Sequence, residues 1–257
     1  MSNETRTGSY GTVSDLGVGV LMLDTHFRRR RGDVGNALTW SFPVQFKIVR
    51  EARPENVVEG GAEGLLEPFI DAARELVDLG VSGITTSCGF LAVFQQQLAA
   101  ALPVPVATSS LLQIPLIEAM LPKGKRAGIL TFSAESLGAR HLRSVGARED
   151  TPIGGLPADS LFRLFYGDKP AVADFDTFEA EAVTAALRLV EKHPDIGAIV
   201  CECTNLPPHS SAIAGATGLP VFDIVGFIEW FAKGLRPTAF VQTDDSGPSG
   251  RRRHAGE

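Results

Sequence analysis

Hydrophobic residues occur along this chain either in short continuous runs or in longer segments with helical spacing. The runs Gly17–Leu23, Val44–Val49 and Val81–Ser87 hold few polar side chains, which is typical of strands buried on both faces of a sheet. Residues 62–79 place apolar side chains on one helical face, and Gly80 ends that segment. Strands that alternate with helices predict an α/β fold, in which mainly parallel sheets are flanked by helices.

The same alternation continues through the second half of the chain. Arg126–Phe132 and Ile196–Glu202 have the composition of buried strands, and residues 175–192 have helical spacing. Ser133 is predicted to cap a helix that ends before Gly146. The second half is therefore expected to hold a sheet of its own.

The two halves also repeat each other in detail. Cys88 ends an apolar run, and 115 positions later Cys203 ends a similar run. Pro105 follows the first cysteine after seventeen residues, and Pro220 follows the second after seventeen residues. A repeat of this length predicts two similar lobes rather than a solenoid, whose period is much shorter.

We assign residues 16–110 to lobe 1 and residues 111–222 to lobe 2. The polar or Gly-, Ser- and Arg-rich segments 1–15 and 241–257 are expected to be flexible. Ligands of parallel sheets bind beyond the carboxyl ends of the strands. If a pseudo-two-fold axis relates the lobes, the two strand-end cysteines meet at an active site between them.

Composition and charge argue against some classes of binding partner. The chain has 257 residues and a formal net charge of −6, which argues against nucleic acid as the main partner. No apolar run approaches the roughly 18 residues of a membrane span, and residues 1–14 lack the apolar stretch of a signal peptide. Three cysteines fit a reducing compartment with free thiols. We expect a cytoplasmic protein that acts on a small molecule and binds neither nucleic acid nor membrane.

Cys88 and Cys203 are the candidate catalytic residues. A cysteine at the turn from strand to helix feels the positive end of the helix, which is expected to lower its pKa toward neutrality. One thiolate would then remove a proton from a carbon beside a carboxylate or carbonyl, and the other thiol would return a proton to the opposite face. This chemistry needs no cofactor. A lone strand cysteine is usually a packing residue, and we interpret Cys201 in that way.

Polar residues around the cysteines are candidates for substrate binding. Hydroxyl, amide and backbone N–H groups near the thiols would hold a carboxylate and stabilise an enolate-like intermediate; they belong to Ser87, Gly89, Thr204 and Asn205. Asp24 and Thr131 end two other predicted strands. Asp24 would orient a thiol, bind an amino group or cap a loop. Asn36 lies in a glycine-bearing loop that would close over the site.

Two further motifs leave simpler interpretations open. The run Arg28–Arg31 would attract an anionic substrate or form a solvated surface. The spacing of Cys201 and Cys203 is not the usual zinc spacing, and no second cysteine or histidine pair accompanies it. We therefore predict no metal site.

At these residues the chain resembles the aspartate/glutamate racemase superfamily of cofactor-independent enzymes. Cys203-Thr204-Asn205-Leu206-Pro207 is similar to the Cys-Thr-His-Tyr-Pro stretch of glutamate racemases, although Asn205 replaces the histidine. The first motif, Ser87-Cys88-Gly89-Phe90, departs from their Cys-Asn-Thr pattern. The resemblance covers about residues 16–235 and extends to hydantoin racemases, arylmalonate decarboxylases and maleate isomerases. The departures argue against glutamate as the substrate.

The resemblance implies two α/β lobes with the site between them, and a homodimer or higher homo-oligomer. It implies that the helix after each Pro-Val strand crosses to the other lobe, so that residues 223–236 pack back on lobe 1. By position, Cys88 and Cys203 become the acid/base pair. The carboxylate site is then lined by Ser87, Gly89, Thr131, Thr204 and Asn205.

The function expected from these observations is that of a racemase or epimerase, an isomerase that needs no pyridoxal phosphate. Its substrate would be an amino acid or a hydantoin-like molecule. Three alternatives stay open. An arylmalonate-decarboxylase-like enzyme would need only one cysteine, and a maleate-isomerase-like enzyme would use one cysteine as a nucleophile. A non-catalytic metabolite-binding protein would also have a central cleft.

Overall fold

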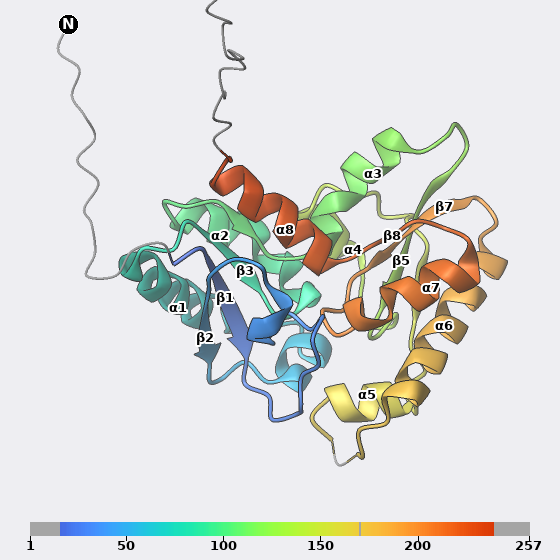
Figure 1. The fold of residues 1–257 in the computed structure, drawn as a ribbon, viewed down its shortest axis with the longest axis horizontal. Coiled ribbons are helices and arrows are strands. Elements are labelled where there is room, and N and C mark those ends of the chain that lie inside the picture. Colours follow the sequence, from blue (N-terminus) through green and yellow to red (C-terminus); the bar gives the residue numbers. More distant parts are fainter. Residues whose placement is uncertain (1–15, 170, 239–257) are drawn as a thin grey trace, which may run out of the picture.

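The structure, a computed structural model, describes residues 16–169 and 171–238. Figure 1 shows two lobes side by side, each with a sheet flanked by helices. All strand pairs are parallel. The predicted α/β fold with two similar lobes is therefore confirmed. The segments predicted to be flexible, 1–15 and 241–257, lie outside the described residues.

The sheet of lobe 1 has the strand order β2-β1-β3-β4. Its strands are β1 (Val18–Leu23), β2 (Val44–Val49), β3 (Gly83–Thr86) and β4 (Val106–Ala107). Every residue of β1 is buried, as expected for a central strand covered on both faces. Successive side chains point to opposite faces of a strand. Leu21 and Leu23 accordingly pack with Phe69 of helix α1 (Leu66–Leu79), whereas Val18 and Val20 pack on the other face.

The sheet of lobe 2 repeats this arrangement with the order β6-β5-β7-β8. Its strands are β5 (Arg126–Thr131), β6 (Ile153–Gly155), β7 (Ile196–Cys201) and β8 (Val221–Phe222). Thr86 ends β3, and Cys201 ends β7 at the position 115 residues later. The repeat seen in the sequence is thus a repeat of the sheet.

Two helices cross between the lobes. Helix α3 (Ile114–Met120) follows β4 but packs against β5 of lobe 2. Helix α8 (Ile224–Leu235) follows β8 but places Ile224, Phe227 and Ile228 on the face of β1 that carries Val18 and Val20. Both helices follow the carboxyl end of the preceding strand, and by packing on the other lobe they join the two lobes.

The remaining helices lie in the connections between successive strands. The longer ones are α2 (Gln95–Ala101), α4 (Ala139–Ser144), α5 (Leu161–Tyr166), α6 (Phe175–Lys192) and α7 (Ser210–Thr217). Short helical turns are η1 (Ala37–Thr39), η2 (Glu55–Glu59), η3 (Gly89–Phe94), η4 (Ser110–Gln113) and η5 (Pro207–His209). In the part of the chain that the structure describes, no helix is both long and apolar enough to span a bilayer.

Two predicted helix starts are wrong. Helix α1 begins at Leu66 rather than at residue 62, because Ala62 and Gly64 have φ angles of 59° and 73°, which a right-handed helix does not allow. Helix α4 begins at Ala139, and the Ser133 hydroxyl hydrogen-bonds the Ser136 hydroxyl instead of capping a helix.

Candidate functional site

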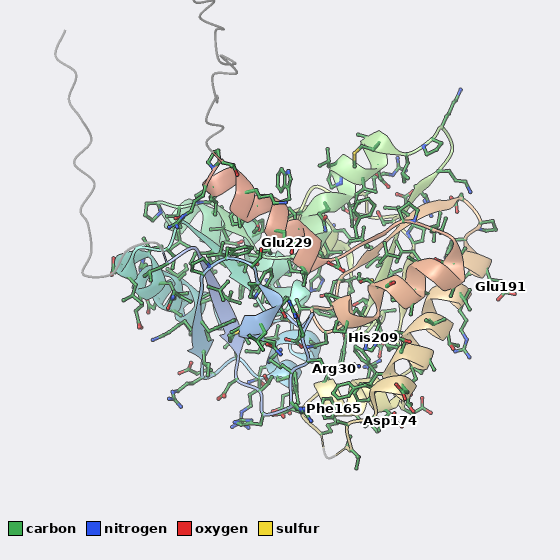
Figure 2. The ribbon with its side chains drawn as sticks, in the orientation of Figure 1. Arg30, Phe165, Asp174, Glu191, His209 and Glu229 are labelled. Atoms are coloured by element: carbon green, nitrogen blue, oxygen red, sulfur yellow. The ribbon has the colours of Figure 1, made fainter. Side chains whose placement is uncertain are left out.

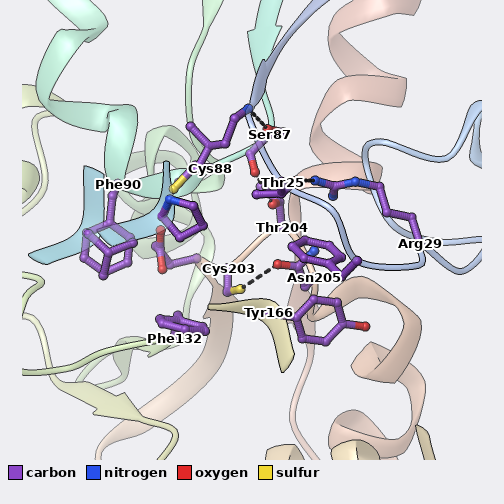
Figure 3. A pocket seen from close by; sticks show the side chains of 16 residues that line it. Thr25, Arg29, Ser87, Cys88, Phe90, Phe132, Tyr166, Cys203, Thr204 and Asn205 are labelled. Atoms are coloured by element: carbon purple, nitrogen blue, oxygen red, sulfur yellow. Dashed lines mark hydrogen bonds between the residues drawn. The ribbon is translucent and has the colours of Figure 1, made fainter. Parts of the chain in front are cut away.

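A pocket lies where the carboxyl ends of β3 and β7 meet. Its unfilled space, part of it open to solvent, amounts to about 430 Å³. Its walls come from both lobes: the loop after β1, the turns after β3, β5 and β7, and Tyr166 of α5. The pocket therefore stands at the place that the repeat predicted, between the two strand-end cysteines (Figure 3).

The structure brings most of the predicted site residues together. Six of them line this pocket: Ser87, Cys88, Gly89, Cys203, Thr204 and Asn205. Three do not line it: Asp24, Asn36 and Thr131. Asp24 lies 3.9 Å from His26, and Asn36 caps η1 by accepting a hydrogen bond from the backbone N–H of Leu38. Thr131 does not line the pocket itself, but its hydroxyl hydrogen-bonds the carboxylate of Glu202, which does.

Hydrogen bonds hold the two strand ends against each other. The Thr204 hydroxyl in lobe 2 donates to the backbone oxygen of Ser87 in lobe 1 at 2.6 Å. The Ser87 hydroxyl in turn accepts a hydrogen bond from the backbone N–H of Leu23 at 2.9 Å. Both hydroxyls are thus engaged in positioning the walls, and only the Ser87 O–H proton is left to point toward a ligand.

Burial raises the pKa of both pocket thiols. For Cys88 burial is the largest cause and the charge of Glu202 the second, and together they outweigh the backbone N–H groups of Phe90 and Leu91, which act in the opposite direction. For Cys203 burial and Glu202 are again the two largest causes. This corrects the prediction of thiols with lowered pKa values. The turn after Cys88 is a short 3-10 helix, and its positive end is too weak to offset desolvation.

Glu202 is the most consequential residue that sequence reasoning missed. Its side chain is fully buried and lines the pocket. The Thr131 hydroxyl donates to Glu202 Oε2 at 2.6 Å, whereas Oε1 has no hydrogen-bond partner among the described residues. Burial raises the pKa of this carboxyl to about 7. A signal was present in the sequence, since an acidic residue that ends an apolar strand is rarely buried without a function.

Gly89 makes room for this carboxylate. A Cβ atom at Gly89 would lie 2.3 Å from the backbone oxygen of Glu202 and 2.3 Å from its Oε1. No residue larger than glycine fits there unless the opposite lobe moves. The structure thus gives Gly89 a steric role in the contact between the lobes.

A second charged group reaches the pocket from the loop after β1. Arg29 donates to Asp33 Oδ1 at 2.7 Å and to the Thr25 hydroxyl at 2.8 Å. Asn205 Nδ2 donates to Asp33 Oδ2 at 2.6 Å, and the Cys203 thiol lies 3.7 Å from Asn205 Oδ1 (Figure 3). This chain of contacts fixes the guanidinium at the pocket wall. Two of its five N–H groups are used, so that the others are available to an anionic ligand.

Only one member of the arginine run enters the pocket. Arg28 and Arg31 are exposed, whereas the side chain of Arg29 is 13% exposed. The guanidinium of Arg30 lies 4.5 Å from the ring centroid of Phe175, and Figure 2 shows it among residues of lobe 2 near Phe165. Arg29 thus lines the pocket, whereas Arg28 and Arg31 are exposed to solvent; attraction of an anionic substrate stays a prediction.

Aromatic rings complete the walls. Phe27 and Tyr166 meet edge to face at 5.0 Å, and the guanidinium of Arg29 lies 4.4 Å from the Phe27 ring centroid. Phe90 and Phe132 line the other side of the pocket, beyond the two cysteines (Figure 3). The loop that carries Phe27 and Arg29 has no hydrophobic periodicity, and for this reason sequence patterns could not indicate which of its residues face the site.

Cys201 stays outside the pocket. It is buried in the apolar cluster of lobe 2, and its backbone oxygen accepts a hydrogen bond from the Ser110 hydroxyl. Over residues 16–169 and 171–238, no group of three or more His, Cys, Asp or Glu side chains is arranged to hold a metal ion.

Comparison with curated proteins relates the chain to one kind of enzyme. It is 30% identical over 240 residues to a dimethylsulfoniopropionate lyase of Durusdinium sp. clade D, and the match covers 89% of this chain and 78% of that protein. It is 33% identical over 222 residues to dimethylsulfoniopropionate lyase 3 of Emiliania huxleyi, with 81% of this chain and 57% of that protein covered. The chain thus spans little more than half of the length of some of its relatives. No family model matches it.

Comparison with solved structures gives the fold. Unliganded arylmalonate decarboxylase aligns with 85% of this chain and 92% of its own at a TM-score of 0.52 and 15% identity. A glutamate racemase from Bacillus anthracis aligns with 86% of this chain and 82% of its own at a TM-score of 0.55 and 14% identity. The fold is therefore that of the aspartate/glutamate racemase superfamily, as the sequence predicted. Within that fold, the chain belongs to the family of the dimethylsulfoniopropionate lyases.

Proposed function

We propose that this protein is a lyase that cleaves dimethylsulfoniopropionate by removing a proton from the carbon next to the carboxylate. The observation that carries the proposal is the meeting of the Cys88 thiol and the Arg29 guanidinium in one pocket, in a chain with lyase relatives. An arginine suits the carboxylate of such a substrate, and a thiolate suits the removal of its α-proton.

The reaction balances without an added reactant. The thiolate takes a proton from the α-carbon, and the electrons of that C–H bond form a double bond to the β-carbon. The bond from the β-carbon to sulfur breaks, and its electron pair stays on sulfur. Dimethyl sulfide leaves as a neutral molecule, and acrylate remains. Arg29 and the Ser87 hydroxyl would stabilise the charge that develops on the carboxylate oxygens as the proton leaves.

Cys88 is the better base of the two thiols. The backbone N–H groups of Phe90 and Leu91 and the charge of Arg29 all favour its thiolate. Glu202 opposes the ionisation of both thiols, but Cys203 is opposed by Cys88 and Asp33 as well and is favoured only by the backbone N–H of Asn205. We therefore assign proton removal to Cys88, and we assign to Cys203 a neutral thiol that contacts the substrate from the other lobe.

The proposal is tested by incubation of the purified protein with dimethylsulfoniopropionate. Dimethyl sulfide is measured in the headspace, and acrylate is followed by proton NMR. We expect equal amounts of both products from the native protein and a rate about 1000-fold lower from Cys88→Ala. Cys201→Ala removes a thiol outside the pocket and is the matched control, which should keep its activity. A native protein that releases neither product contradicts the proposal.

A racemase is the second candidate, because both thiols face one pocket from opposite lobes. Inversion of a carbon needs an acid and a base on its two faces, whereas elimination needs one base. In deuterated water, a racemase would exchange the α-proton of a chiral amino acid or hydantoin and lose this exchange in both Cys88→Ala and Cys203→Ala. Exchange in that panel without release of dimethyl sulfide would replace the lyase proposal by this one.

A further inference from the structure

The carboxylate of Glu202 is buried without a counter-ion. Among the described residues, no Lys, Arg or His forms an ion pair with it, and its Oε1 has no hydrogen-bond partner. A buried charge of this kind is costly, and it calls for a ligand, a reaction or a bound water that accounts for it. Because Glu202 also lines the pocket, the partner missing from the protein has a place to bind.

Two aromatic residues line the pocket together with this carboxylate. Phe90 follows Gly89, where an added Cβ would lie 2.3 Å from Glu202 Oε1, and Phe132 follows Thr131, whose hydroxyl donates to Glu202. Both phenylalanines line the pocket with it. Aromatic walls attract alkylated cations, because the face of each ring is negative and the methyl groups of the cation prefer an apolar contact. One oxygen of this carboxylate is left without a donor, and the rings that line the pocket with it offer an apolar contact, so that the site suits an alkylated cation.

We propose that Glu202, Phe90 and Phe132 form a subsite for a sulfonium or quaternary ammonium group, which we name the onium subsite. The inference rests on the proposed function and defines its substrate class: a short zwitterion with an onium cation at one end and a carboxylate at the other. Figure 3 shows the two cysteines between Arg29 on one side and Phe90 and Phe132 on the other. The carboxylate of the ligand thus binds at Arg29 and the cation at Glu202, with the α-carbon between them beside the thiols.

The subsite is tested with two inert ligands that differ only in charge. 3-(Trimethylammonio)propionate carries a fixed cation, and 4,4-dimethylpentanoate replaces its nitrogen by carbon in the same shape. Titration calorimetry at pH 8 gives both dissociation constants without any turnover. We expect the native protein to bind the cation about 30-fold more tightly, the effect of one desolvated charge pair. Equal affinities would overturn the proposal, whether or not the protein proves to be a lyase.

Glu202→Gln keeps the shape of the side chain and removes its charge. In this variant the two ligands should bind within about threefold of each other, since only the aromatic attraction is left. Glu191→Gln removes a charge from the exposed surface of α6, far along lobe 2 (Figure 2), and should keep the native preference. For turnover, Glu202→Gln should raise KM and leave kcat within about tenfold of native. A variant that keeps the 30-fold preference, or that loses kcat with KM unchanged, contradicts a binding role.

The native protein supplies a test that needs no variant. The carboxyl of Glu202, with its pKa raised to about 7, loses its charge as the pH falls, and the preference for the cation should disappear between pH 8 and pH 5.5. The other ionisable groups at the pocket are Arg29, Asp33, Cys88, Tyr166 and Cys203. Burial raises the pKa of Cys88, Tyr166 and Cys203, so that the charge of these three groups changes little over this range in the ligand-free protein. A preference that does not change with pH contradicts the assignment to Glu202.

Discussion

The turns after β3 and β7 occupy equivalent places in the two lobes but are built differently. Ser87 and Glu202 each donate a backbone N–H to the neighbouring strand, to Leu21 at 2.9 Å and to Leu130 at 2.8 Å. Their backbones are therefore matched. Their side chains are not, because one turn carries a small hydroxyl and the other carries a buried carboxylate.

The next matched pair differs in a complementary way. Gly89 in lobe 1 leaves space for Glu202, and Thr204 in lobe 2 donates to the backbone oxygen of Ser87. At this contact, lobe 1 provides the space for Glu202, and lobe 2 provides the hydrogen-bond donor for the Ser87 oxygen. A symmetric fold thus holds an asymmetric pocket. The buried carboxylate of Glu202 comes from lobe 2, and Arg29 comes from the loop after β1. An asymmetric pocket suits a substrate whose two ends differ.

The sharpest way to test this asymmetry is to remove the two thiols separately. We expect Cys88→Ala to lower kcat for elimination about 1000-fold, the usual worth of a positioned base. Cys203→Ala should lower it only about tenfold, the worth of one contact. Steady-state release of dimethyl sulfide gives both numbers. Equal losses would mean that the thiols act as a symmetric pair.

Gly89→Ala breaks the fit between the turns. The added Cβ meets a backbone oxygen of the opposite lobe, which cannot rotate away, and we expect a loss of about 2 kcal/mol in the free energy of unfolding. Urea unfolding measures it. Gly215→Ala is the control, because a Cβ there meets nothing within 4 Å and the residue lies in helix α7, so that this variant should gain up to about 1 kcal/mol. A stable Gly89→Ala protein would show that the lobes separate freely.

Glu202→Gln removes the charge that distinguishes the turns. The folded protein holds the pKa of this carboxyl at about 7, above its ordinary value of 4.5, so that the folded state binds more protons than the unfolded state between these values. Stability therefore falls as the pH rises from 4.5 to 7, and the penalty is complete above pH 7. Between pH 4.5 and pH 8, the free energy of unfolding of the native protein should fall by about 3 kcal/mol relative to that of the variant. Parallel unfolding curves across this range would contradict the buried charge.

Thr204→Val tests the reciprocal contact. The backbone oxygen of Ser87 loses its hydroxyl donor, which should cost about 1.5 kcal/mol in the free energy of unfolding. Thr184→Val removes a similar hydroxyl from an exposed turn of α6 and should cost less than about 0.5 kcal/mol. Chemical unfolding of both variants side by side gives the difference. No difference would mean that water replaces the donor.

Much of the fold was readable from the sequence, because its elements depend on local patterns. Strand β2 and helix α6 have the bounds that hydrophobic spacing predicted. The repeat of Cys88 and Cys203 predicted where the lobes meet. The start of α1 was not predictable in this way, since it depends on the positive φ angle of Ala62, a residue type that gives no warning of such a backbone.

Only the part of the candidate site that repeats between the two halves of the chain could be predicted from the sequence. The cysteines and their polar neighbours recur at one offset, whereas Arg29 reaches the pocket through contacts that no periodicity encodes. The hydrogen bond that ties its partner Asp33 to Asn205 joins residues 172 positions apart. The pKa direction of the thiols was missed for the same reason, because burial depends on how the two lobes close around them.

The position of the two thiols at equivalent strand ends, one in each lobe, has a stereochemical consequence. The α-carbon of dimethylsulfoniopropionate carries two hydrogens that are mirror-related, and nothing in a free molecule distinguishes them. A ligand fixed at one end by Arg29 and at the other by Glu202 cannot turn end over end, and where the pocket walls also prevent its rotation about the long axis, the thiol of lobe 1 meets the same hydrogen each time. Elimination in this pocket would then be enantiotopically selective, although neither substrate nor product is chiral.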